Sequence, residues 1–223
     1  RWIARLKLPR APQIAFEEGV FDRLNFTVEQ GAVGGLPLTG FAFGASHNPE
    51  AIIDSPAQFD LIDGGGVTVG CLAFAEVDGS GNVNVTRLKA QPHVLAGAGG
   101  FINIAMGTRK LVYCGTLMAG GLDIRIEAGS VHIAQDGRFQ KFVARVQDVT
   151  FNGRLAAEQG QEVWYFTELT KDGLVLAEVA PGVDLERDIR AKVGFPLQVA
   201  ADCRAMDARI FRTEPMGLAA DWT

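Results

Sequence analysis

Short apolar runs alternate with turn residues through the first half of the chain. A nearly continuous apolar run over residues 67–77 predicts a strand of a parallel sheet that is covered on both faces. The turn residues at 78–82 and the alternating residues at 83–86 predict a hairpin and its returning strand. Residues 110–115 predict a second buried strand, and we expect a helix to begin next to Phe101, ahead of that strand.

Glycine clusters and a proline mark the ends of other elements in this half. Residues 24–29 predict a strand that ends abruptly ahead of Gly31. Asn48 is a suitable N-cap and Pro49 suits a first helical position, which predicts a short helix there. The three glycines at 64–66 are expected to form a connector.

Alternating apolar and polar residues predict antiparallel strands in the second half. Residues 122–127 and 131–133 flank a turn at 128–130, which predicts a hairpin. Further along, the pattern predicts a turn at Asp136–Gly137, strands over 161–167 and 174–179, and a charged helix over 184–192 capped by Asp184. The fold class that follows is a single α/β domain with a mixed sheet, flanking helices and a β-rich hairpin part over residues 122–180.

Composition excludes several classes of protein. Of the 223 residues, 48% are apolar and 21% are charged, which excludes a disordered or collagen-like chain. The net charge of -5 argues against nucleic acid or an anionic membrane as a partner held by bulk charge, although a local basic pocket for a phosphate stays open. The 27 glycines indicate many tight turns or close backbone approaches, which are frequent at ligand sites.

The cysteines and histidines are dispersed. Cys71, Cys114 and Cys203 form no CxxC pair and are odd in number, so we expect no disulfide framework, no cysteine-based zinc site and a reducing, cytoplasmic location. The three histidines are also far apart, and we expect no metal site. No apolar run approaches the ~20 residues of a membrane span, and residues 1–6 lack the core of a signal peptide. Because the chain does not begin with Met, we expect a fragment, a processed piece or a partly observed chain.

Glu29 is the first candidate for chemistry. This carboxylate follows an apolar strand-like run and precedes Gly31, Gly34 and Gly35. The carboxyl edge of an α/β sheet is where such folds bind ligands, and the glycines allow a substrate to approach closely. A nucleophilic or acid/base role stands against the ordinary alternative, a strand-end glutamate in solvent or in a salt bridge.

The second candidate is the glycine loop at 97–100, sequence GAGG. Its backbone N–H groups suit a phosphate cradle or an oxyanion hole, although the loop matches neither the P-loop nor the GxGxxG spacing. The alternative is a plain tight turn. His47 carries no attached GxSxG-type motif, so a surface histidine is expected there rather than a base.

With these motifs in view, the chain resembles the family I CoA-transferases, in the propionate/acetate (short-chain acyl) branch, and specifically their carboxyl-terminal (β) half. The resemblance extends over roughly residues 15–217. It is carried by TVEQGAVGG (27–35), FGA (43–45) with Asn48, AIIDSPAQFD (51–60), DGGG (63–66), LAGAGGFINI (95–104), GGL (120–122), APGVDLERDI (180–189) and MDARIF (206–211).

The resemblance implies a NagB/RpiA/CoA-transferase-like fold, with residues 1–223 forming one β-type domain. It implies that Glu29 is the covalent nucleophile of a ping-pong transfer of CoA between a short-chain acyl-CoA and a carboxylic acid, through a γ-glutamyl-CoA thioester. The oxyanion or CoA-binding positions would be Gly97, Gly99 and Gly100. CoA would be a substrate with no further cofactor, and the implied partners are an α-type half or subunit, acyl-CoA and carboxylate substrates, and an oligomeric assembly.

Two departures from the family pattern keep other hypotheses open. The amino-terminal half is absent, and residues 1–14 are an atypical segment in which the GIGxP-type loop expected before Glu17–Glu18–Gly19 is missing. A catalytically inactive or truncated module with an assembly or CoA-binding role is therefore the alternative to the enzyme. A phosphate-binding α/β domain, such as a sugar-phosphate isomerase, is a third hypothesis, weakened by the lack of a basic cluster near the glycine loops.

Overall fold

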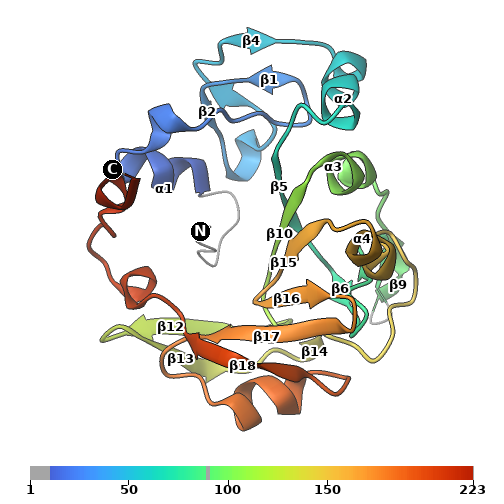
Figure 1. The fold of residues 1–223 in the computed structure, drawn as a ribbon, viewed down its shortest axis with the longest axis vertical. Helices are drawn as coiled ribbons and strands as arrows, with labels where there is room; N and C mark the ends of the chain where they lie inside the picture. The colour runs from blue at the N-terminus through green and yellow to red at the C-terminus, as the bar shows by residue number, and fades with distance from the viewer. Residues whose placement is uncertain (1–10, 89–90, 223) are drawn as a thin grey trace.

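A computed structural model describes residues 11–88 and 91–222 of the chain. Residues 11–63 form a small unit (top of Figure 1) that consists of short elements around two hairpin-like strand pairs. Its elements are α1 (Ala11–Glu17), η2 (Phe21–Arg23), β1 (Ala32–Val33), β2 (Leu36–Pro37), η3 (Gly40–Ala42), β3 (Ser46–His47), β4 (Ala51–Ile52) and α2 (Ser55–Asp63).

A six-stranded mixed sheet in the order β18-β17-β16-β15-β10-β5 forms the centre of the molecule (Figure 1). Strands β5, β10 and β15 are parallel, β16 is antiparallel to both of its neighbours, and β17 is parallel to β18. The strands are β5 (Val69–Ala73), β10 (Lys110–Cys114), β15 (Glu162–Trp164), β16 (Thr167–Thr170), β17 (Gly173–Val179) and β18 (Gln198–Ala205). The expected mixed α/β sheet is therefore confirmed.

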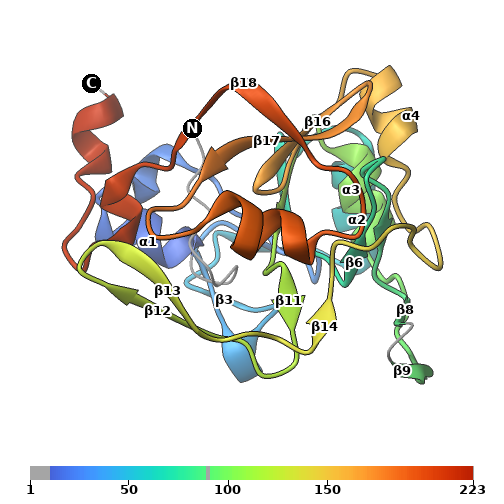
Figure 2. The same ribbon diagram turned by 90° about the horizontal axis from the view of Figure 1, so that it is seen from below.

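Smaller strand pairs and helices complete the fold. The pairs are β6 (Glu76–Val77) with β7 (Val83–Asn84), β8 (Arg87–Leu88) with β9 (Gln91–Leu95), β11 (Met118–Ala119) with β14 (Phe139–Gln140), and β12 (Asp123–Glu127) with β13 (Ser130–Gln135). The helices are α3 (Phe101–Gly107), α4 (Gly153–Glu158), the π-helix η4 (Leu185–Ile189) and the 3-10 helices η5 (Arg190–Lys192), η6 (Ala208–Phe211) and η7 (Leu218–Trp222). Figure 2 shows the β12–β13 hairpin and the β8–β9 pair at opposite ends of the molecule.

An aromatic cluster at the ends of the central strands forms much of the core. The rings of Tyr113 and Tyr165 are stacked with centroids 4.9 Å apart, and the ring of Phe74 lies edge-on to Tyr165 and to Phe142. Tyr165 and Phe142 are buried. Such offset and edge-to-face pairs stabilise the core beyond the burial of their area.

A buried carboxylate joins the two ends of the described chain. Glu18 is 8% exposed, and it accepts hydrogen bonds from the backbone N–H groups of Met216, Gly217 and Leu218 at 2.6, 2.8 and 3.3 Å. Figure 1 shows the result, with the carboxyl-terminal helical turn beside α1. Because one charged acceptor satisfies three buried or half-buried donors, this contact fixes the amino-terminal unit against the end of the chain.

The structure confirms the predictions that rested on strong local patterns. The hairpin over 122–133 is β12–β13, whose turn residues Ala128 and Gly129 both have positive φ angles of 49° and 78°, as a two-residue hairpin turn requires. Residues 110–115 contain β10, and a helix begins at Phe101. Asp184 does cap the helical segment after it, by accepting from Arg187 N–H at 2.7 Å, although that segment is a π-helix followed by a 3-10 turn.

Four local predictions were wrong. Residues 161–167 do not form one strand, because β15 ends at Trp164 and the antiparallel β16 begins at Thr167. Residues 24–29 form no strand, and only Thr27 makes an isolated bridge, with Val33. No helix begins at Asn48, which has φ 50° between β3 and β4; the helix begins at Ser55 and is capped by Asp54. The run over 67–77 is not covered on both faces, since Cys71 and Ala73, which lie on the same face of β5, are exposed.

Within residues 11–88 and 91–222, no helix combines the length and the apolar character that crossing a bilayer requires.

Candidate active site

Glu29 lies at the tip of a tight turn. The turn is closed by the Gly31 N–H, which donates to the Val28 carbonyl at 3.0 Å, while the Val28 N–H donates to the Ala32 carbonyl at 3.1 Å. Glu29 was expected at the end of a strand; instead the chain reverses at this residue before it enters β1. Glu29 is half-buried there.

The turn is fixed to β4 at a position that only glycine can occupy. Gly31 has φ 104°, and a Cβ there would lie 2.1 Å from the Ile53 carbonyl oxygen. The Ile53 N–H also donates to the Gly31 carbonyl at 2.9 Å. The close approach of these two backbones holds the turn, so a glycine next to the carboxylate has a structural reason.

A buried pair of side chains supports the same turn from below. Gln58, on α2, is fully buried, and its Nε2 donates to the Thr27 Oγ1 at 2.9 Å. Thr27 in turn donates to the Ala32 carbonyl at 3.0 Å. The Gln58 Oε1 is buried without a hydrogen-bond partner. This chain of contacts determines where the turn lies relative to α2.

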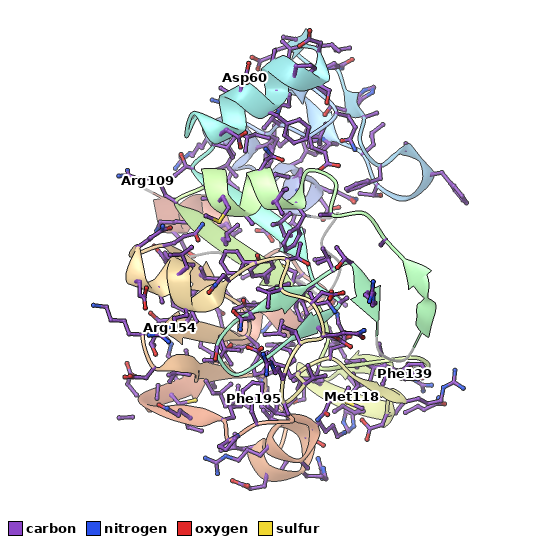
Figure 3. The ribbon with its side chains drawn as sticks, turned by 90° about the vertical axis from the view of Figure 1, so that its right-hand side faces the viewer. Asp60, Arg109, Met118, Phe139, Arg154 and Phe195 are labelled. Carbon is purple, nitrogen blue, oxygen red and sulfur yellow. The ribbon has the colours of Figure 1, made fainter. Side chains whose placement is uncertain are left out.

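The Glu29 carboxylate lies against the glycine loop. An ideal Cβ on Gly100 would be 2.6 Å from Glu29 Oε2 and 2.7 Å from two ring atoms of Phe59. The two segments are 71 positions apart in the sequence, and they meet because α2 packs on α3 (Figure 3). Asn103 on α3 donates to both carboxylate oxygens of Asp63 on α2, at 3.2 and 2.8 Å. The structure therefore brings together the first candidate and one residue of the second.

The rest of the glycine loop borders open space. Gly97 and Gly99 are exposed, and no atom lies within 4 Å of a Cβ built on either. The loop turns through the Phe101 N–H, which donates to the Ala98 carbonyl at 3.1 Å. In the described part of the chain, the N–H groups of Gly99 and Gly100 have no acceptor; Gly99 is exposed, whereas Gly100 is buried against Glu29 and Phe59.

In the part of the chain that the structure describes, the Glu29 carboxylate makes a weak polar contact. The nearest polar contact is from Gln30 Nε2 to Glu29 Oε1, at a long 3.4 Å, and the Phe59 ring lies beside the same glycine. In residues 11–88 and 91–222, no cluster of three or more metal-ligating side chains occurs. A half-buried carboxylate next to free amide donors and an apolar ring is equipped for nucleophilic attack on a carbonyl carbon.

The other candidates lie apart from this site. His47 is exposed on β3, and the glycines at 64–66 join α2 to β5, as expected of a connector. A cavity of about 680 Å³ also lies elsewhere, lined by Glu76, Gln140, Val143, Ala144, Arg145 and Gln147. Gln58 and Phe59 were missed as parts of the site because a glutamine and a phenylalanine on a helix are ordinary core residues.

Comparison with known proteins identifies relatives over nearly all of the chain. It is 44% identical over 209 residues to the acetate CoA-transferase YdiF of Escherichia coli strain K12, covering 92% of this chain and 39% of that protein. It is 39% identical over 212 residues to the caffeate CoA-transferase of Acetobacterium woodii, covering 92% of this chain and 40% of that protein. No family model matches.

The fold agrees with the sequence relationship. The crystal structure of the acyl-CoA transferase YdiF from E. coli O157:H7, in a thioester complex with CoA, superposes with a TM-score of 0.86 at 40% identity, covering 93% of this chain and 40% of that one. The chain thus spans about two fifths of the length of these relatives. Over nearly all of its length the chain is therefore similar, in sequence and in fold, to a part of these CoA-transferases.

Proposed function

We propose that this chain carries the nucleophile of an acyl CoA-transferase and that the nucleophile is Glu29. The observation that carries the proposal is the contact between the Glu29 carboxylate and the glycine loop at Gly100. The relatives named as CoA-transferases, and the YdiF structure described as a thioester complex with CoA, support the same reaction class. A short-chain acyl group is the substrate class we propose, since one relative is named for acetate.

The proposed reaction is a ping-pong exchange in four steps. The Glu29 carboxylate attacks the acyl thioester carbonyl; a C–O bond forms, the C–S bond breaks and CoA leaves as the thiolate. The thiolate attacks the glutamyl carbonyl of the resulting anhydride, which forms the γ-glutamyl-CoA thioester and releases the first acid as its carboxylate. The acceptor carboxylate then attacks this thioester, which forms a second anhydride and expels the thiolate. The thiolate attacks the acceptor carbonyl of that anhydride, the C–O bond to the glutamyl group breaks, and Glu29 is released as its carboxylate together with the new acyl-CoA. No general base is needed because both nucleophiles react as anions.

The glycine loop would stabilise the charge that develops. Each attack produces a tetrahedral oxyanion, and the free N–H groups of Gly99 and Gly100 are donors beside the reacting carboxylate. Gly97 borders the same open space and would contribute backbone to CoA binding. Because no described side chain lies within 4 Å of a Cβ built on Gly97 or Gly99, a planar thioester has room to approach the loop on that side.

The complete site requires more than this chain. The described residues supply the carboxylate, the loop and the Phe59 ring, and the remaining wall of the cleft would come from the other part of the transferase, an α-type half or subunit. We propose that the working enzyme is this assembly and that it uses CoA as a substrate and needs no cofactor. We also propose that it is an oligomer in the cytoplasm.

The test is capture of the covalent intermediate. The full transferase that contains or binds this chain is incubated with acetyl-CoA or propionyl-CoA without an acceptor acid. Intact-mass and peptide analysis should then find the mass of CoA less water on the peptide that carries Glu29. Glu29→Gln should abolish both the adduct and the transfer, and Glu168→Gln, which changes an exposed glutamate on β16, should leave both unchanged. An unmodified Glu29 in an enzyme that still transfers CoA would refute the proposal.

A further inference from the structure

Lys141 lies at the carboxyl ends of two parallel strands. Its Nζ is 4.0 Å from the centroid of the Phe74 ring, and a Cβ on Gly115 would lie 2.9 Å from the same atom. Phe74 directly follows β5, and Gly115 directly follows β10. The backbone of Lys141 is held on both sides, because its N–H donates to the Leu117 carbonyl at 3.0 Å and its carbonyl accepts from the Val77 N–H at 2.8 Å.

The amine has no carboxylate partner in the part of the chain that the structure describes. Lys110 pairs with Glu162 at 2.7 Å, and Lys192 pairs with Asp136. Lys141 is half-buried, and its Nζ lies over the Phe74 ring. A cation–π contact at a partly exposed position is worth about 0.5–1 kcal/mol, which does not offset the loss of water around a charged ammonium group.

Burial consequently favours the neutral amine. It lowers the pKa of Lys141 from 10.5 to about 8. At pH 8 about half of these side chains would carry a lone pair, compared with roughly one in three hundred for an ordinary lysine. A neutral amine is a nucleophile toward thioester carbonyls.

The position of this amine is the edge where the substrate would bind. Open α/β sheets bind their ligands beyond the carboxyl ends of the strands. The loop that meets Glu29 leads into the same region, because the ring of Phe101 lies 5.9 Å from that of Tyr113, the penultimate residue of β10. Gly115 is exposed, so the amine is approachable from the side that has no Cβ.

We propose that Lys141 is a site of covalent acylation by acyl-CoA. The inference rests on the proposed function only in taking acyl-CoA as the reagent that this protein meets. The neutral Nζ attacks the thioester carbonyl; a C–N bond forms, the C–S bond breaks, CoA leaves as the thiolate and the amine loses one proton to solvent. The product amide is uncharged, so acylation removes the cost of the charge over Phe74. Carboxylates do not cleave an amide, so the modification accumulates.

The test measures acylation rates of several lysines in one sample. The full-length protein is incubated with acetyl-CoA at pH 8, and the acetylated fraction at each lysine is followed by mass spectrometry after digestion with a protease that does not cut at lysine. Lys171, exposed in the turn between β16 and β17, is the internal control. We expect Lys141 to react about ten times faster than Lys171, because a much larger fraction of its amine is neutral. The factor is smaller than the ratio of the neutral fractions, because the amine with the lower pKa is also the weaker nucleophile.

Two further arms make each outcome decisive. Glu29→Gln should leave the acylation of Lys141 unchanged. Acylation of Lys141 does not require a CoA adduct on Glu29, so failure of the proposal for Glu29 can be told apart from failure of the proposal for Lys141. Trace labelling with acetic anhydride reports whether the amine is reactive toward a small reagent. The proposal is overturned if acetyl-CoA acylates Lys141 no faster than Lys171, including the case in which only the anhydride reaches it.

Discussion

Gly100→Ala is the sharpest test of the candidate site. Gly100 has φ -73°, a conformation that alanine adopts without strain, so the substitution adds a methyl group without changing the backbone. That methyl carbon would lie 2.6 Å from Glu29 Oε2 and 2.7 Å from the Phe59 ring, where ordinary contacts begin at 3.4 Å. The carboxylate is at the flexible end of its side chain, so it would move by about 0.8 Å rather than disrupt the fold.

The expected magnitude follows from that displacement. A misplacement of about 1 Å at a reacting group costs up to roughly a hundredfold in rate, so we expect kcat for CoA transfer to fall between about tenfold and a hundredfold. The free energy of unfolding should fall by no more than about 2 kcal/mol, because alanine is a poorer N-cap than glycine and the Phe59 ring must adjust.

The assay compares two glycines of the same loop. Steady-state transfer and the amount of CoA thioester on Glu29 are measured in the full-length enzyme, with urea unfolding as the measure of stability. Gly97→Ala is the comparison within the loop: no atom of the described residues lies within 4 Å of its Cβ, so it leaves Glu29 in place. We expect its KM for acyl-CoA to rise, because Gly97 borders the space proposed for CoA, while its kcat stays within about twofold. Full activity in Gly100→Ala, or an equal loss in Gly97→Ala, would show that the contact with Glu29 has no catalytic meaning.

Three other substitutions follow from the same structure. Glu29→Gln should lower transfer at least about a thousandfold, measured as initial rate, and a residual rate above that bound would contradict the nucleophile. Gln58→Leu and Thr27→Val should each lower kcat. Because the two side chains share one hydrogen bond of 2.9 Å, their double-mutant cycle in kcat should show a coupling free energy of about 0.5–3 kcal/mol. Strictly additive effects would show that this hydrogen bond does not hold the turn that bears Glu29. Lys141→Met should raise the free energy of unfolding at pH 7 by about 1–2 kcal/mol, because the folded pKa of Lys141, about 8, lies below its unfolded value of 10.5. The unfolded chain therefore binds more protons than the folded chain between pH 8 and 10.5, and the stability of the wild type rises with pH through that window. Urea unfolding at pH 7 and pH 10 checks the sign, and an equal gain at both pH values would refute it.

Local patterns were sufficient where one residue type determined the backbone. The turn of the β12–β13 hairpin was predictable because Gly129 tolerates a positive φ and alternating residues flank it. The strand β10 was predictable because its apolar residues are buried between β5 and β15. In both cases the sequence signal and the structural cause lie within a few residues of each other.

The errors occurred where contacts across the fold override a local preference. Asn48 would serve as an N-cap, but it lies in a left-handed turn between β3 and β4, and the carboxylate of Asp54 takes the capping role six residues later. The expected strand over 24–29 does not form, because the hydrogen bond from the Gly31 N–H to the Val28 carbonyl closes a turn at Glu29. The resemblance to a family suggested the role that we propose for Glu29, yet neither periodicity nor spacing could predict its contact with Gly100.

That contact depends on how α2 sits on α3. The turn that bears Glu29 is fixed to α2 through Gln58, and the glycine loop leads directly into α3. The two helices are joined by the hydrogen bonds between Asn103 and Asp63. A shift of one helix along the other would therefore move Glu29, the proposed nucleophile, relative to the glycine loop without altering either segment. It follows that the site is positioned by this helix pair more than by the central sheet, and that residues far from the carboxylate on either helix will influence the rate through its position.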